Sequence, residues 1–144
     1  MRALIQRVSQ ASVAVDDDTV GEIGKGLLVL LGVEKEDTRE IAVRLVNRVL
    51  TYRVFPDEKK HMNRSLLDTG GALLLVSQFA LVADTKKGTR PSFSAAAAPQ
   101  LAKTLYDNSV DLAKEQCETQ TGIFGADMQV SLTNDGPVTF LLES

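Results

Sequence analysis

The sequence is poor in the residues that form disulfides and metal sites. Its 144 residues include one cysteine, Cys117, and one histidine, His61. One cysteine cannot form an intramolecular disulfide, which fits a reducing compartment, and no cluster of cysteine and histidine residues is spaced for zinc. His61 stands in the polar stretch "DEKKHMNRS", where an exposed loop residue is the favoured interpretation. We therefore expect no metal site within the chain.

Long apolar runs and an excess of positive charge are also missing. The longest runs, "GLLVLLGV" and "ALLLV", fall far short of the roughly 20 residues of a membrane span, and the start "MRALIQRVSQ" lacks the apolar core of a signal peptide. We expect a cytoplasmic protein with no membrane partner. The net charge of −3 gives no overall basic footprint for nucleic acid, although a local basic patch stays open.

The remaining composition is that of a folded protein. Hydrophobic residues make up 44% of the chain and charged residues 24%, the profile of a soluble globular domain. A length of 144 residues is enough for one hydrophobic core. No repeat, linker or low-complexity tract divides the chain, so residues 1–144 are predicted to form a single domain.

Alternating apolar residues predict strands in the first third of the chain. "RALIQRV", "ASVAV" and "TVGEI" alternate, and the apolar run at 27–31 predicts a strand covered on both faces. From residue 38 to 51 the apolar residues recur every three or four positions, which predicts a helix. Asp37 is its predicted N-cap, with Glu40 completing a variant of the capping box. Residues 56–71 are predicted to form a loop with little regular structure.

The second half of the sequence predicts a strand, a helix and two further strands. "ALLLVSQF" predicts a central strand from 72 to about 79, and Pro99 suits the first turn of a helix that ends near 117. "ADMQVSL" and "VTFLLE" predict two strands, with "TNDGP" as the loop of a hairpin between them. The order of these elements predicts an α/β protein with largely antiparallel or mixed sheets and two packed helices.

Three places break these patterns, and such breaks are common at functional sites. Ser77 and Gln78 end a strand that is otherwise apolar, Arg7 lies on the apolar face of the first strand, and Pro137 follows Gly136 directly before a strand. Each has a plain structural interpretation: a solvated strand end, a side chain that extends to solvent, and a trans proline in a hairpin turn. Spacing alone does not separate these interpretations from functional ones.

The loop expected at 82–99 is unusually long. It holds 18 residues, and structureless loops of this length inside a compact domain are usually functional. Lys86, Lys87 and Arg90 surround a glycine in it, a composition suited to phosphate binding, although such charged runs are more often solvated. Neither a Walker motif nor GxGxxG is present, so no nucleotide-binding fingerprint supports a phosphate site.

Two motifs, in the right order and at the right separation, resemble those of the D-aminoacyl-tRNA deacylases, also called D-tyrosyl-tRNA deacylases. They are "SQFAL" at 77–81, similar to the family's SQFTL stretch, and NxGPxT, here Asn134 to Thr139. The likeness runs essentially end to end and extends to "ALIQRV" at 3–8, "GLLVLLGVEKED" at 26–37, "RPSFS" at 90–94 and "FGADMQVSLTNDGPVTF" at 124–140. The resemblance implies a small α/β domain with two packed sheets and helices, which works as a homodimer without metal or organic cofactor.

The activity implied by the resemblance is hydrolysis of the ester between a D-amino acid and the terminal ribose of tRNA, and of glycine mischarged on tRNA. The active site would lie at the dimer interface. The Gly136–Pro137 bond would be cis, and this pair would reach into the partner's site, where main chain grips the α-ammonium group and excludes an L side chain. Arg7 would hold the incoming Gly136–Pro137 loop of the partner by its carbonyl groups, and Asn134 and Thr139 would complete the motif.

The resemblance also implies roles around the first motif. Ser77, Gln78 and Phe79 would wall the pocket for the terminal adenosine and the ester, and the N–H groups of Phe79 and Ala80 would face the developing oxyanion. Further residues that the resemblance assigns are Phe93 and Met128 in the adenosine pocket, and Lys86, Lys87 and Arg90 as ligands of tRNA phosphates.

One position departs from the family pattern in a way that bears on the chemistry. Ala80 stands where the family usually has threonine, so no side-chain nucleophile is available there. We expect the 2′-OH of the tRNA to assist the attacking water, with the protein supplying position and an oxyanion site. The alternative is a catalytically impaired homologue that binds the RNA 3′ end. Ile123 stands where the family commonly has arginine, and no consequence follows from this change. The sequence does not indicate which D-amino acids or which tRNAs are preferred.

Overall fold

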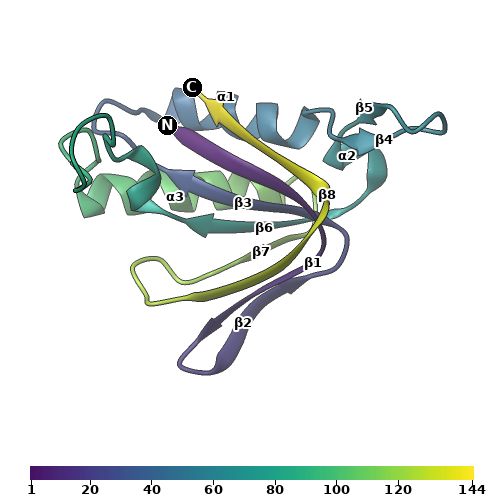
Figure 1. The fold of residues 1–144 in the computed structure, drawn as a ribbon, viewed down its shortest axis with the longest axis horizontal. Helices are drawn as coiled ribbons and strands as arrows, with labels where there is room; N and C mark the ends of the chain where they lie inside the picture. Colours follow the sequence, from purple (N-terminus) through teal and green to yellow (C-terminus); the bar gives the residue numbers. More distant parts are fainter.

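The structure, a computed structural model of residues 1–144, is built around a curved six-stranded sheet with helices on one of its faces (Figure 1). Its elements, in chain order, are β1 (Arg2–Val15), β2 (Asp18–Ile23), β3 (Gly26–Gly32), α1 (Arg39–Thr51), β4 (Phe55–Pro56), β5 (Met62–Arg64), α2 (Leu66–Thr69), β6 (Ala72–Ser77), the 3₁₀ helix η1 (Phe79–Val82), α3 (Pro99–Lys114), β7 (Thr119–Thr121) and β8 (Gln129–Glu143). The mixed α/β class predicted from the sequence is confirmed.

The main sheet is antiparallel on one side and parallel on the other. Its strand order is β2-β1-β3-β6-β7, and β8 pairs with the other edge of β1. β1 pairs antiparallel with β3 over its first half and with β2 over its second half, so β2 and β3 follow one another along one edge of β1. β3, β6 and β7 are parallel, which requires the crossovers that α1 and α3 provide. β4 and β5 form a separate two-stranded sheet.

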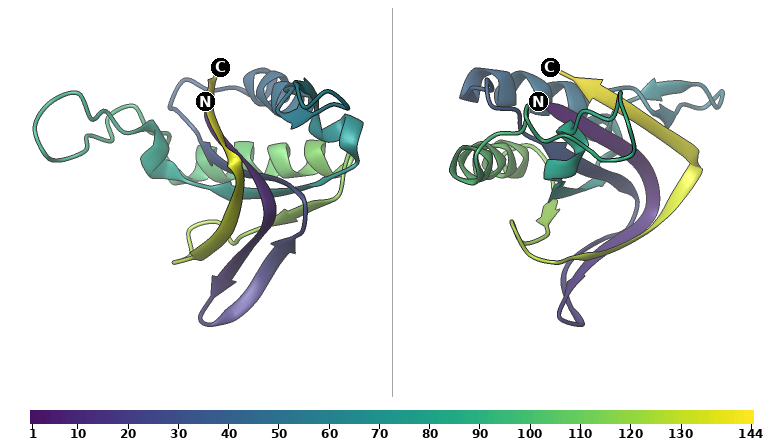
Figure 2. Two further views of the ribbon diagram at one scale, coloured as in Figure 1. Left: turned by 45° about the vertical axis from the view of Figure 1, so that its right-hand side comes forward. Right: turned by 60° about the vertical axis from the view of Figure 1, so that its left-hand side comes forward.

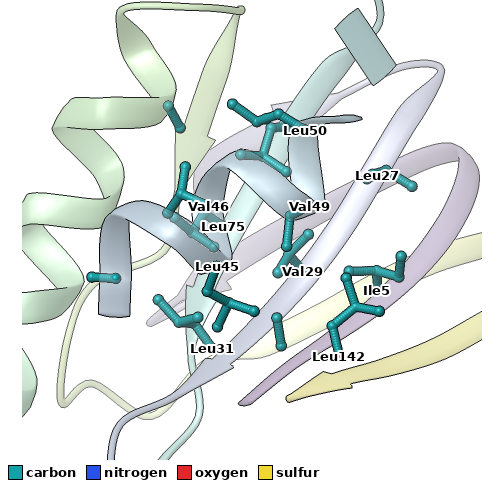
Figure 3. Packing of buried hydrophobic residues seen from close by; sticks show 14 of the residues in the cluster. Ile5, Leu27, Val29, Leu31, Leu45, Val46, Val49, Leu50, Leu75 and Leu142 are labelled. Atoms are coloured by element: carbon teal, nitrogen blue, oxygen red, sulfur yellow. The ribbon is translucent and has the colours of Figure 1, made fainter. Parts of the chain in front are cut away.

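The larger part of the core lies between this sheet and the two long helices. Figure 3 shows Leu45 and Val49 of α1 close to Leu31 and Val29 of β3. A smaller apolar cluster on the opposite face of the sheet includes Leu28. β3 is therefore covered on both faces, as its apolar run predicts.

Both long helices were predictable from the sequence. α1 spans Arg39–Thr51 and buries the apolar stripe that defined it, and α3 has Pro99 in its first turn and ends at Lys114. No helix of the structure is long and apolar enough to cross a membrane.

The predicted N-cap of α1 is wrong by one residue. Thr38 is the N-cap, and its side chain accepts a hydrogen bond from the N–H of Ile41. Asp37 is buried instead and accepts hydrogen bonds from the ammonium group of Met1, at 2.9 Å, and from the N–H of Glu34, at 2.6 Å. Because its carboxylate already faces a buried cation, it is not available to the helix end.

Two segments contain structure that local sequence signals did not predict. Residues 56–71 include β5 and the short helix α2, which Ser65 caps through reciprocal hydrogen bonds with Asp68. The strand predicted to continue to about residue 79 ends at Ser77 and is followed by η1.

The two alternating segments at the start of the chain form one strand rather than two. β1 is 14 residues long, and a turn at Asp16 and Asp17 joins it to β2. Both turn residues have positive φ angles, 49° and 67°, a combination typical of two-residue hairpin turns. Figure 2 shows the pronounced bend of this long strand and of β8 beside it.

The hairpin predicted at the end of the chain is wrong. β8 runs antiparallel to β1 along its whole length, from the pair Ala14–Gln129 to the pair Arg2–Glu143. The polar segment in its middle is a bulge, where shifts of register near Val8 leave residues of β8 without a partner opposite them. Because one long partner strand binds both halves, the chain continues in the same direction through what looks locally like a turn.

Candidate active site

The carboxyl end of β6 opens into a cavity of about 480 Å³. Its walls come from the end of β6, the start of α3 and the segment that leads into β8, and 11 of its 16 lining residues are hydrophobic. The structure brings Ser77, Gln78, Phe79 and Met128 together in this lining. A largely apolar cavity with a few polar groups at one side is the usual form of a small-molecule site.

The backbone at the mouth of this cavity has two free N–H groups. Gln78 continues the pairing with β3, because its N–H donates to the carbonyl of Leu31 at 2.9 Å. The chain then turns into η1, and the N–H groups of Phe79 and Ala80 donate to no acceptor within the protein. Gly32 permits this turn, since a Cβ atom there would lie 3.1 Å from the carbonyl oxygen of Gln78.

The second motif forms a braced bend in the middle of β8. The Gly136–Pro137 bond is cis, and both residues are exposed. Asn134 crosses the base of the bend: its Oδ1 accepts the N–H of Val138 at 2.7 Å, and its Nδ2 donates to Oγ1 of Thr139 at 2.8 Å. These contacts account for the asparagine and the threonine of the motif within a single chain.

Arg7 ties the bend to the segment that follows α1. Its Nε donates to the carbonyl of Asp135 at 2.9 Å and its Nη1 donates to the carbonyl of Val54 at 2.7 Å. An arginine on an apolar strand face therefore finds acceptors for its donors, as the sequence analysis required. The contact is made within one chain, to the residue before Gly136.

The bend lies far from the cavity of its own chain. Val8 pairs with Asn134 on one side and with Gly26 on the other, and Gly26 pairs with Ala72 at the start of β6. Ser77, where the cavity opens, comes five residues later on that strand, a distance of roughly 17 Å at about 3.3 Å per residue. No residue beyond 130 lines the cavity.

Comparison with known proteins identifies the family. The family model described as D-Tyr-tRNA(Tyr) deacylase matches residues 4–143. The chain belongs to this deacylase family. A Teredinibacter turnerae protein named D-aminoacyl-tRNA deacylase is 57% identical over 145 residues and covers 100% of both chains. A Haemophilus influenzae protein of the same name is 61% identical over 142 residues, 99% of both chains.

Solved structures support the same fold. One, described as "c-Myc DNA Unwinding Element Binding Protein", is 40% identical with a TM-score of 0.96, over 100% of this chain and 99% of its own. A second, described as "Structural Analysis of a probable eukaryotic D-amino acid tRNA deacylase", has a TM-score of 0.85 at 19% identity, over 98% and 97% of the two chains. At that identity the second likeness concerns the fold alone.

The loop between β6 and α3 carries the other residues expected at the site. Phe93 packs on Phe79 with ring centroids 4.9 Å apart, which extends the aromatic wall outside the cavity lining. Lys86, Lys87 and Arg90 are exposed in this loop, and none of them forms an ion pair.

Two aromatic residues of the cavity were missed by the sequence analysis. The hydroxyl of Tyr106 donates to the carbonyl of Leu75 at 2.7 Å, and its ring lies 5.9 Å from that of Phe124, which also lines the cavity. Burial raises the pKa of Tyr106 well above its usual value, so the hydroxyl stays protonated at neutral pH. The available signal was the position of Tyr106 on the apolar stripe of α3, because a buried tyrosine hydroxyl needs a partner.

Proposed function

We propose that this chain hydrolyses the ester that links a D-amino acid to the 3′-terminal adenosine of tRNA, and the same ester of glycine mischarged on tRNA. The observation that carries the proposal is the apolar cavity at the end of β6 with the free N–H groups of Phe79 and Ala80 at its mouth. The deacylase names of relatives that cover the whole chain support it. Residues 1–144 act as one domain, in the cytoplasm, where aminoacyl-tRNAs are used.

The cavity suits the terminal adenosine. Its lining is mostly hydrophobic and includes the rings of Phe79, Tyr106 and Phe124, against which a base can pack. Phe93 supports Phe79 from outside, and Met128 adds a flexible apolar side chain to the lining. Stacking of a base on an aromatic side chain is typically worth about 1–3 kcal/mol.

The main chain supplies the oxyanion site. When water attacks the ester, negative charge develops on its carbonyl oxygen, and the N–H groups of Phe79 and Ala80 are available to receive it. One such donor lowers the barrier by about 3–4 kcal/mol in well-studied hydrolases. Substitution of the usual threonine by Ala80 leaves these donors in place, because both belong to the backbone.

The protein offers no activated nucleophile. Ala80 has no attacking atom, and the hydroxyl of Ser77 makes no hydrogen bond to a base. Tyr106 is protonated and already donates to Leu75, and His61 lies between β4 and β5, outside the cavity lining. The 2′-OH next to the ester is then the nearest group able to assist water, so the RNA contributes to its own hydrolysis.

Chirality is read by a second protomer. Because about 17 Å of β6 separates the bend from the cavity of its own chain, Gly136 and Pro137 act in the cavity of a homodimer partner. Their exposed main chain, braced by Asn134 and Arg7, grips the α-ammonium group and leaves no space for an L side chain. A rigid main chain discriminates by exclusion better than a side chain, which can move aside.

The surface of β8 supports dimer formation. β8 is paired on one side only, along a strand of 15 residues. Unprotected edges of this length are usually covered in native proteins. Large hydrophobic side chains are also exposed along it: Val130, Leu132, Phe140 and Leu141.

The decisive test is a deacylation assay with D-Tyr-tRNA and L-Tyr-tRNA. We expect turnover of the D ester and of Gly-tRNA, and none of the L ester. Tight binding of the RNA 3′ end without turnover would favour the alternative that Ala80 raises, a catalytically impaired homologue. Lys86, Lys87 and Arg90 are proposed to contact tRNA phosphates, so their charge reversal should raise KM and leave kcat unchanged.

A further inference from the structure

The hairpin made by β4, β5 and the turn between them has an excess of basic side chains, two of which form no ion pair. Between Arg53 and Arg64 the chain has four basic and two acidic side chains. Both acidic side chains are engaged inside the hairpin. Asp57 accepts hydrogen bonds from Nδ2 of Asn63 at 2.8 Å and from the N–H groups of Lys59 and His61, both at 2.9 Å.

The two lysines at the tip of the hairpin are left free. Glu58, the other acidic residue, lies 3.5 Å from Arg64. Lys59 and Lys60 are exposed, and neither forms an ion pair. The tip is held in shape by its own backbone, because the N–H of Lys60 donates to the carbonyl of Asp57 at 3.0 Å. Two adjacent ammonium groups are thus presented to solvent on a defined turn.

This hairpin is attached to the chirality-reading bend. Arg7 donates to Val54, directly before β4, and to Asp135, directly before Gly136. The rings of Tyr52 and Phe140, which lie just beyond these two segments, are 6.1 Å apart. The hairpin therefore stays next to the bend when the bend contacts another protomer.

The hairpin and the basic loop lie at opposite ends of one protomer. Figure 1 shows β4 and β5 at the right-hand end and the loop that follows β6 at the left-hand end. The left-hand view of Figure 2 shows the same separation. Lys86, Lys87 and Arg90 stand at the cavity end, and Lys59 and Lys60 at the end that carries the bend.

We propose that Lys59 and Lys60 of one protomer bind phosphate groups of the tRNA whose 3′ end occupies the partner's cavity. The inference rests on the proposed function, because the bend of one protomer must enter the other protomer's site. Each tRNA then meets two basic surfaces, the loop of the protomer that binds its adenosine and the hairpin of the protomer that supplies Gly136 and Pro137. The ligand chemistry is that of the phosphodiester backbone of an RNA helix.

The first experiment measures the salt dependence of KM for D-Tyr-tRNA. Loss of two phosphate contacts reduces the slope of log KM against log salt by about 1.8, which amounts to roughly tenfold between 50 and 200 mM salt. We expect this change in Lys59→Glu/Lys60→Glu, with kcat unchanged. The matched control is Arg39→Glu/Arg44→Glu, which makes the same change of charge at two exposed positions of α1 that form no ion pair and should keep the wild-type slope.

The second experiment asks which protomer supplies the lysines. In a heterodimer in which one chain carries Gly136→Val, the only complete site combines the cavity of that chain with the bend of its partner. Lys59→Glu/Lys60→Glu should raise KM and reduce the slope of log KM against log salt by about 1.8 when placed in the chain with the intact bend. The same pair should have no effect in the chain that carries Gly136→Val.

The outcomes separate the inference from the proposed function. An active wild-type enzyme whose slope is unaffected by Lys59→Glu/Lys60→Glu would overturn the inference and leave the function standing. If Lys59→Glu/Lys60→Glu raised KM only when placed in the chain that carries Gly136→Val, the lysines would act on the tRNA bound by their own protomer. That result would overturn the assignment to the partner. Absence of D-ester hydrolysis by the wild type would overturn the proposed function itself. Thermal melting of each variant confirms that it is folded.

Discussion

Replacing Gly136 with alanine tests whether the bend in β8 does more than hold the strand on β1. Gly136 has a φ of +141°, where L residues are strained, and this costs about 1–3 kcal/mol. The added Cβ would also lie 2.8 Å from Cγ2 of Val138 and 3.1 Å from Nη2 of Arg7. The arginine tip can move, but the valine can do so only by changing rotamer, so we expect a total loss of stability of about 3 kcal/mol.

That loss is too small to abolish folding at 25 °C. A domain of this size is stable by about 5–15 kcal/mol, so Gly136→Ala remains folded, with a melting temperature lower by roughly 10 °C. If the bend had no role in the site, the rate per folded molecule would be unchanged. The proposed role requires a fall in kcat/KM of at least ~100-fold, because relief of the crowding against Val138 shifts the main chain of the bend, and a small misplacement of a positioning group can cost this much.

A matched control comes from Gly70, the residue that ends α2. It also has a positive φ, +69°, but a Cβ there would meet nothing within 4 Å. Gly70→Ala should lower stability by about 1 kcal/mol through backbone strain alone and leave kcat/KM unchanged. Equal rates per folded molecule for wild type, Gly70→Ala and Gly136→Ala would refute the role of the bend.

Three further results are expected. Ser77→Ala should lower kcat by less than about tenfold, whereas loss of a true serine nucleophile costs about 10⁶-fold. D-aminoacyl-tRNA ending in 2′-deoxyadenosine should react at least ~100-fold more slowly than the ribose substrate in single-turnover assays, and equal rates would remove the RNA from the mechanism. Asp37→Asn should destabilise the fold by about 3 kcal/mol in urea titrations, because the buried ammonium group of Met1 loses one of its two carboxylates. Asp111→Asn, at an exposed position on α3, should have no such effect.

Local sequence patterns predicted the secondary structure correctly in segments whose structure depends mainly on their own sequence. The helix at 38–51 followed from apolar spacing, α3 from Pro99 and the stripe behind it, and β3 from an apolar run that is buried on both faces. The N-cap was misplaced because Asp37 and Thr38 are both good caps. A distant cation decided between them, and no nearby residue reveals that cation.

Long-range pairing decided what local patterns did not predict. Asp135 and Gly136 form a standard hairpin signal, but the length of β1 allows both halves of β8 to pair with it, so the signal marks a bulge. The residues of the site also fall into two groups, those predictable from local sequence and those that depend on long-range contacts. The first motif could be read along one strand, whereas the contact of Phe93 with Phe79 and the contribution of Tyr106 depend on how a loop and a helix return to the sheet.

The spacing of bend and cavity along β6 has a consequence for how activity depends on the amount of protein. In the proposed homodimer each site combines the cavity of one chain with the bend of the other, so activity requires two chains. Upon dilution, its specific activity should decline in step with dissociation, and a lone protomer should leave every ester intact. In the proposed homodimer, protein concentration therefore sets the fraction of chains that are active.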